Sequence, residues 1–197
     1  MEREATTSYK IGFAHSALVS ETVLLARSFV ESGDWSQAKE KVLSENLFQA
    51  RAERTRVIIF DELKKRLGYL SADQIQLVSL DAASDAKHLT WVGLCNRYAF
   101  IGDFAVEVVG PKYRAGLFRI TDEDYRYFFN AKAEFHPEFD AVSDKTRTNA
   151  HAAVFQMLKQ CELIDNMNQV IPQMISPALQ NCTSRDDLEF IPGAIYL

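Results

Sequence analysis

The residues best suited to chemistry form a polar stripe on one predicted helix, which begins after Ser143. The members of this polar stripe are three or four residues apart, so they share one face of a helix, and none is acidic: Lys145, Asn149, Ala152, Gln156 and Lys159. Thr148 flanks the stripe, and Arg147 adds a positive charge to the helix. Amide, hydroxyl and cationic side chains contact base edges and phosphates, and a small alanine lets a helix approach closely. An ordinary solvated helix face has the same composition.

The neighbouring elements follow the order of a winged helix-turn-helix. A Thr121–Asp124 start signal predicts a helix to about residue 132, and a turn at His136-Pro137 separates it from the helix capped by Ser143. The second helix has an apolar stripe opposite its polar one: Ala150, Val154, Phe155, Leu158 and Cys161. Two short apolar segments then flank the turn-forming residues 165–168, which predicts a β-hairpin as the wing.

Two further groups of basic residues lie outside this unit. One is near the start of a predicted helix: Arg51, Arg54 and Arg56. The other follows a Gly-Pro pair: Lys112 and Arg114, with Arg119 nearby. Both groups are candidates for phosphate contact, because a local excess of positive charge attracts nucleic acid. The alternative for the first group is a solvated helix face.

No set of residues predicts catalysis, a metal site or a cofactor. The sequence contains no glycine-rich phosphate loop and no nucleophile elbow. The four histidines are scattered, and no cysteine pair has metal-binding spacing. The acidic run 122–124 is better explained as favourable charge at a helix start than as a magnesium site. We therefore expect a protein that is not an enzyme, with no catalytic residues, no metal and no cofactor.

Composition indicates an ordinary globular chain. It has 197 residues, 47% hydrophobic residues and a net charge of −5, so DNA binding would have to depend on local patches. No stretch predicts a secretory signal or a membrane span, and three distant cysteines are typical of a reducing compartment. We expect a cytoplasmic protein without membrane contact, in which Cys95 and Cys161 are buried thiols.

Helical periodicity and caps predict a helical first half. The expected helices cover residues 15–32, 35–46, 51–67, 72–80 and 84–109. Two glycines and a proline in 110–117 predict a loop and a boundary there. The predicted fold is all-α: a helical bundle (1–110) and a winged helix-turn-helix-like half with a short β-hairpin (111–197), which pack together or form one compact domain.

Five segments, taken in order between Ser16 and Leu179, resemble a known family. They are SGDWSQAKEKVLSENLFQ, the helix Thr55–Leu67, NRYAFIGDFAVEVV, the T-x-x-D-Y-x-x-F-F motif at Thr121–Phe129, and the K-T-x-x-N start of the helix at Lys145. Together they resemble the BrxA family of the BREX phage-resistance systems. The resemblance implies a small helical protein without enzymatic activity, encoded beside a methyltransferase, an ATPase and a phosphatase-like protein. It also implies a fold like that of an RNA-binding antitermination protein, and binding to double-stranded DNA.

Three functions remain open from the sequence. The first is a double-stranded DNA-binding accessory protein that uses the polar stripe and the basic groups. The second is an adaptor that holds other BREX subunits, which the acidic net charge favours. The third is RNA binding by the helical first half through Arg51, Arg54 and Arg56. The family has also been labelled a putative inner-membrane protein, which this sequence does not support because it lacks a spanning segment.

Overall fold

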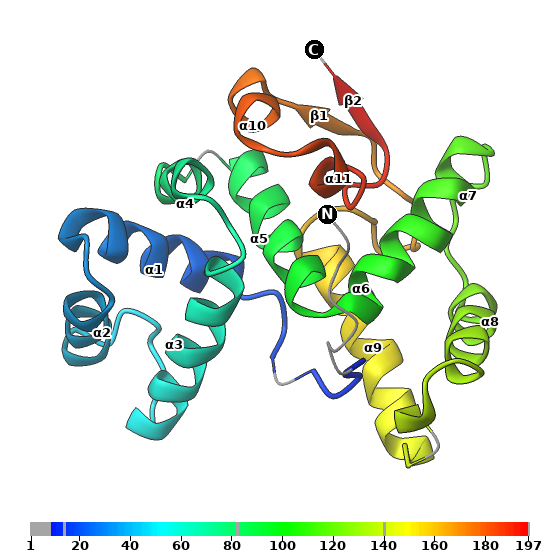
Figure 1. Cartoon of the computed structure of the whole chain (residues 1–197), viewed down its shortest axis with the longest axis horizontal. Coiled ribbons are helices and arrows are strands. Elements are labelled where there is room, and N and C mark those ends of the chain that lie inside the picture. Colours follow the sequence, from blue (N-terminus) through cyan, green and yellow to red (C-terminus); the bar gives the residue numbers. More distant parts are fainter. Residues whose placement is uncertain (1–8, 14, 82, 140, 197) are drawn as a thin grey trace.

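The first half of the chain is a group of four helices, shown in blue to teal in Figure 1. The structure is a computed structural model and describes residues 9–13, 15–81, 83–139 and 141–196. The four helices are α1 (Val19–Ser32), α2 (Trp35–Ser44), α3 (Glu53–Leu67) and α4 (Ala72–Ser79). The predicted caps are confirmed: Asp34 accepts hydrogen bonds from the first turn of α2, and Ser71 with Gln74 forms a capping box on α4. α1 packs against the other three helices.

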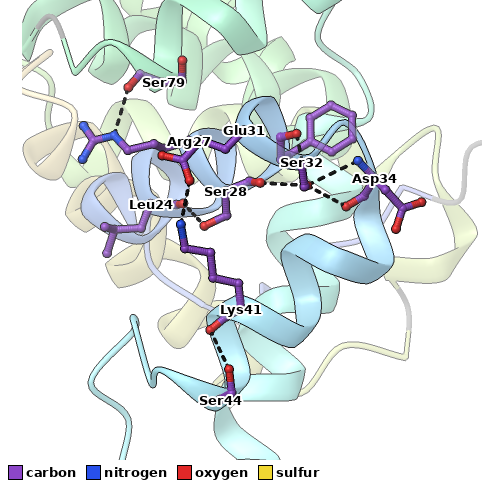
Figure 2. Close-up of polar contacts among 10 residues, drawn as sticks. Leu24, Arg27, Ser28, Glu31, Ser32, Asp34, Lys41, Ser44 and Ser79 are labelled. Atoms are coloured by element: carbon purple, nitrogen blue, oxygen red, sulfur yellow. Dashed lines mark hydrogen bonds and ion pairs between the residues drawn. The ribbon is translucent and has the colours of Figure 1, made fainter.

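Figure 2 shows polar contacts around α1. Lys41 Nζ lies 2.6 Å from Glu31 Oε2, and the Arg27 guanidinium donates to the Ser79 carbonyl oxygen of α4. The Glu31–Lys41 pair is about half exposed. Exposed ion pairs contribute little to stability. Apolar burial must therefore hold these helices together.

The chain next forms a broken helical path through the centre of the molecule (Figure 1). It consists of α5 (Ala83–Arg97), α6 (Ala99–Phe104), a π-helix (Ala105–Val109) and α7 (Gly110–Arg114). The predicted single helix over 84–109 was wrong, because Tyr98 has an extended backbone and separates α5 from α6. The predicted loop at 110–117 was also wrong in its first part. Pro111 is tolerated in α7 because it lies in the first turn, where its missing N–H is least needed.

The second half contains two longer helices and short closing elements. They are α8 (Asp122–Ala133), a 3₁₀ turn (Pro137–Phe139), α9 (Asp144–Gln160), β1 (Gln173–Ile175), α10 (Pro177–Cys182), α11 (Arg185–Leu188) and β2 (Ala194–Tyr196). The capping box of Thr121 and Asp124 is present on α8, and Ser143 caps α9, as predicted. β1 and β2 pair in parallel, with Met174 opposite Ile195. This pairing was not predicted, because parallel strands join segments that are distant in sequence.

The predicted hairpin is reduced to bridges between single residues. Ile164 pairs with Val170 in an antiparallel bridge, and Arg119 pairs with Gln169 in another. The Asp165 carboxylate accepts hydrogen bonds from the N–H groups of Met167 and Gln169, each at 2.8 Å, which holds the turn. The backbone of this turn is therefore ordered although it forms no regular strands.

One buried core contains side chains from both halves of the chain. Phe100 and Phe104 of α6 meet Phe128 of α8, with ring centroids 5.0 and 5.2 Å apart. Trp91 and Tyr98 belong to the core, as predicted, and so do Cys95 and Cys161. Gly93 permits close packing of α5 on α3, since a Cβ there would lie 3.2 Å from a carbonyl oxygen of α3. The proposed boundary near residue 110 stays a prediction, although α7 spans that position.

A buried ion pair in α3 joins several segments. Arg66 Nε lies 2.9 Å from Glu62 Oε1, and their side chains are 2% and 9% exposed. The i,i+4 spacing predicted a surface pair of about 0.2–0.5 kcal/mol, which was wrong because both groups lie inside the molecule. Arg66 also donates to the carbonyl oxygens of Ser16 and Ala17, and the Tyr98 hydroxyl donates to Glu62. This network holds the chain before α1 against α3 and the start of α6.

Removing one partner of this pair should be costly. We expect Arg66→Ala to lower the free energy of unfolding by about 3–5 kcal/mol, because the Glu62 carboxylate would remain buried without its cation. Urea denaturation of both proteins would measure the loss. The double variant Glu62→Leu/Arg66→Met should lose less than Arg66→Ala. A loss below about 1 kcal/mol in Arg66→Ala would contradict the buried-pair interpretation.

Stability should also depend on pH through His88. Burial lowers the pKa of His88 below its ordinary value of 6.5, although its hydrogen bond to Gln173 opposes this shift. The unfolded chain therefore binds more protons than the folded chain just below pH 6.5, and stability falls as the pH drops through that window. The loss is about 1.4 kcal/mol for each unit of lowering. Chemical denaturation at several pH values should give a smaller dependence in His88→Gln; an equal dependence would exclude His88 as a source.

Candidate nucleic-acid interface

The polar stripe lies on the exposed side of α9. Lys145, Asn149, Ala152 and Gln156 are exposed, and Lys159 is partly exposed. The opposite side is buried as predicted, with Val154 and Leu158 inaccessible to solvent. The Ser143 hydroxyl accepts a hydrogen bond from the Thr146 N–H at 3.2 Å, which fixes the first turn. The burial pattern and the cap therefore present the polar stripe as one continuous surface.

The cations of the polar stripe are available for contact. Among the described residues, no carboxylate lies within 4.0 Å of the amines of Lys145 or Lys159. Thr148 is exposed, and its hydroxyl donates to the Asp144 carbonyl oxygen at 3.0 Å. The stripe can offer two ammonium groups, two amides and a hydroxyl oxygen to a ligand.

Arg147 points away from the polar stripe and toward α8. Its guanidinium carbon lies 4.2 Å from the centroid of the Phe129 ring, which is a cation–π contact. Around this pair is a cavity of about 230 Å³, lined by Asp122, Tyr125, Arg126, Phe129, Asn130, Arg147, Thr148 and His151. The sequence predicted Tyr125 and Phe129 only as core. The signal for the cavity was the four-residue spacing of Tyr125 with Phe129 and of Arg147 with His151 on helices that meet.

Lys112 is engaged within the fold rather than free. Its amine pairs with the Asp124 carboxylate, which also accepts a hydrogen bond from the Thr121 N–H at 2.7 Å. Burial raises the pKa of Asp124, but the hydrogen bonds from Lys112 and Thr121 outweigh it, so the pKa lies below its ordinary value. Arg114, at the end of α7, is exposed. Of these two predicted residues, Arg114 has the freer side chain.

The basic residues near α3 lie in another part of the molecule. Arg51 and Arg54 are exposed, whereas Arg56 donates to the Leu43 carbonyl oxygen at the end of α2, at 2.9 Å. In Figure 1 the start of α3 and the start of α9 lie at opposite sides of the lower edge. The structure thus gathers the residues of the polar stripe on one helix, but it does not place Arg51 and Arg54 beside them.

Comparison with known proteins identifies the family. The sequence profile of the BrxA family matches residues 7–187. The chain belongs to the BrxA family. A curated relative, "BREX protein BrxA" from Bacillus cereus (strain H3081.97), is 26% identical over 125 residues, which is 64% of this chain and 60% of that protein. A crystal structure of an uncharacterized protein from Magnetospirillum magneticum has a TM-score of 0.73 at 16% identity, covering 94% of this chain and 96% of its own. That similarity shows a shared fold.

Two searches of this BrxA-family chain bear on other kinds of site. Within 9–13, 15–81, 83–139 and 141–196, no helix has the length and apolar character needed to span a bilayer. The same residues contain no group of three or more His, Cys, Asp or Glu side chains placed to hold a metal ion.

The start of α9 should depend on its cap. Ser143→Ala removes the acceptor of the Thr146 N–H, so the free energy of unfolding should fall by about 1 kcal/mol. Exchange of the first-turn amide hydrogens of α9 should also become faster. Ser44→Ala is a matched control, because the Ser44 hydroxyl donates to the Lys41 carbonyl oxygen and caps no helix start (Figure 2). Equal losses in the two variants would contradict a capping role.

Proposed function

We propose that this BrxA-family protein is a DNA-binding accessory component of a BREX-type phage-defence system and has no enzymatic activity. The proposal depends mainly on the polar stripe of α9, which is exposed, has no acidic member and carries two cations without described acidic partners. In helix-turn-helix proteins the second helix enters the major groove, and α9 follows α8 in that way. The name of the Bacillus cereus relative supports the link to BREX systems.

The backbone around α8 and α9 supports a winged-helix arrangement. Segment 118–120 precedes α8, and its residues exchange hydrogen bonds with 168–170: Val170 N–H donates to Phe118 at 2.8 Å, and Ile120 N–H donates to Asn168 at 2.9 Å. Segment 168–171 also bonds to 163–165 on its other side. The order of pairing places 168–171 in the middle of three short segments, as in the small sheet that carries a wing. Met167, at the turn, is 60% exposed.

The charge distribution favours weak, sequence-independent binding. The protein has a net charge of −5, so repulsion from the rest of the molecule opposes approach to DNA. Cationic contacts to phosphates supply most non-specific affinity, and few cations are present on α9. We therefore expect affinity for double-stranded DNA that falls as salt is added.

Charge reversal on the polar stripe tests this proposal. Lys145→Glu/Lys159→Glu should abolish binding to duplex DNA at low salt, and Lys145→Gln/Lys159→Gln should weaken it. The neutral variant should also reduce the slope of log K against log salt by about two, since each lost phosphate contact removes about 0.9. Fluorescence anisotropy with a random-sequence duplex at several salt concentrations would measure both effects.

A matched control uses two cations far from the stripe. Arg51→Gln/Arg54→Gln should leave duplex binding nearly unchanged if α9 is the interface. If this control loses binding while the α9 variants retain it, the first half is the nucleic-acid surface. Competition with single-stranded RNA would then decide whether that surface prefers RNA. No binding of the unaltered protein to duplex DNA at low salt would refute the proposal.

A second candidate function, an adaptor for other BREX subunits, is favoured by exposed apolar side chains on the closing strands. Met174, Ile195 and Tyr196 are 51%, 42% and 53% exposed, and β1 and β2 place Met174 opposite Ile195. Met174→Lys/Ile195→Lys should release a partner subunit in co-purification while leaving DNA binding intact. Release by the α9 variants instead would assign the partner contact to α9.

A further inference from the structure

The cavity between α8 and α9 has a use that DNA binding does not explain. Its walls are partly aromatic, from Tyr125 and Phe129, and partly polar, from Arg147, Thr148 and His151. Its volume of about 230 Å³ is below the range of about 300–1,000 Å³ for drug-sized ligands, so it suits a smaller molecule.

The Tyr125 side chain supplies an unsatisfied donor beside this cavity. Tyr125 is 3% exposed, and within the described part of the chain its hydroxyl has no hydrogen-bond partner. A buried hydroxyl without a partner is unfavourable, and an acceptor on a ligand would remove that penalty. Burial raises the pKa of Tyr125 above its ordinary value, although nearby Arg147 opposes the shift. The hydroxyl therefore keeps its proton at neutral pH and can donate it.

Arg147 supplies a positive charge at the same place. Its guanidinium lies on the Phe129 ring, and no carboxylate of the described residues is within 4.0 Å of it. The other charges at the cavity have partners: Asp122 lies 3.1 Å from His151, and Arg126 lies 2.8 Å from Glu123. A guanidinium has a planar set of donors that matches a carboxylate, so Arg147 favours that group in a ligand.

We propose that this cavity binds a small organic carboxylate with a flat apolar body. The carboxylate would pair with Arg147 and accept a hydrogen bond from Tyr125, and the apolar body would lie against Phe129 and His151. A DNA phosphate fits less well, since at about 100° per residue Arg147 is on nearly the opposite side of α9 from Lys145. The site is separate from the polar stripe and independent of the proposed DNA binding.

The probe for this site is benzoate, compared with benzamide, acetate and inorganic phosphate. In two-dimensional ¹H–¹⁵N spectra of the full chain, benzoate should cause saturable shifts of the Phe129, Thr148 and His151 amides. Benzamide, acetate and phosphate should each bind about tenfold more weakly or worse, because each lacks either the charge or the flat apolar body. Tyr125→Phe and Arg147→Gln should each weaken benzoate binding about tenfold. Arg54→Gln, an exposed arginine on α3, should not change it.

Several results would overturn the proposal. These are no saturable shift with benzoate, equal binding of benzamide or phosphate, or undiminished binding in Arg147→Gln. Tyr125→Phe removes a single oxygen atom, so its spectrum should stay dispersed and its affinity remain measurable. If Arg147→Gln unfolds, Tyr125→Phe alone decides: unchanged affinity refutes the site. DNA titrations of the same variants are read separately, so failure of one proposal leaves the other measurable.

Discussion

The arrangement of this protein depends on one buried peptide segment between two side chains. The carbonyl oxygens of Ser16 and Ala17 accept hydrogen bonds from Arg66 of α3, and the Ala17 N–H donates to the Gln160 side chain of α9 at 2.8 Å. The guanidinium is held by Glu62, whose carboxylate also accepts from Tyr98 at the break between α5 and α6. A buried charge is tolerated only when its hydrogen bonds are satisfied. This need ties the chain before α1, α3, the start of α6 and the end of α9 to one another.

Local signals in the sequence predicted the helices well. Caps such as Ser71 with Gln74 and Thr121 with Asp124 involve residues three apart, so the sequence contains all that they need. The break at Tyr98 was missed because its cause includes Glu62, which is distant in sequence. The parallel pairing of β1 with β2 was missed for the same reason. The pair of Glu62 and Arg66 was found, but its burial was not, since identical spacing occurs on exposed and buried helices.

The candidate site shows the same limit. The spacing of Lys145, Asn149 and Gln156 predicted their shared exposed face, because helix geometry alone determines it. It could not show that Lys112 pairs with Asp124 or that Arg147 lies on Phe129, since these contacts depend on how α7, α8 and α9 pack. It also could not reveal a cavity, which requires two helices at a defined separation. A polar stripe can therefore be predicted from one helix, whereas a pocket cannot.

The position of Gln160 has a consequence for the order of folding during synthesis. Arg66 follows the Ser16 and Ala17 peptides by about 50 residues, so the ribosome releases this partner early. Gln160 follows Ala17 by 143 residues, and the Ala17 N–H must wait for it. The first four helices can therefore assemble while one side of this peptide is still bonded to water. Emergence of α9 then closes the last hydrogen bond, which makes completion of the bundle and docking of α9 a single late event.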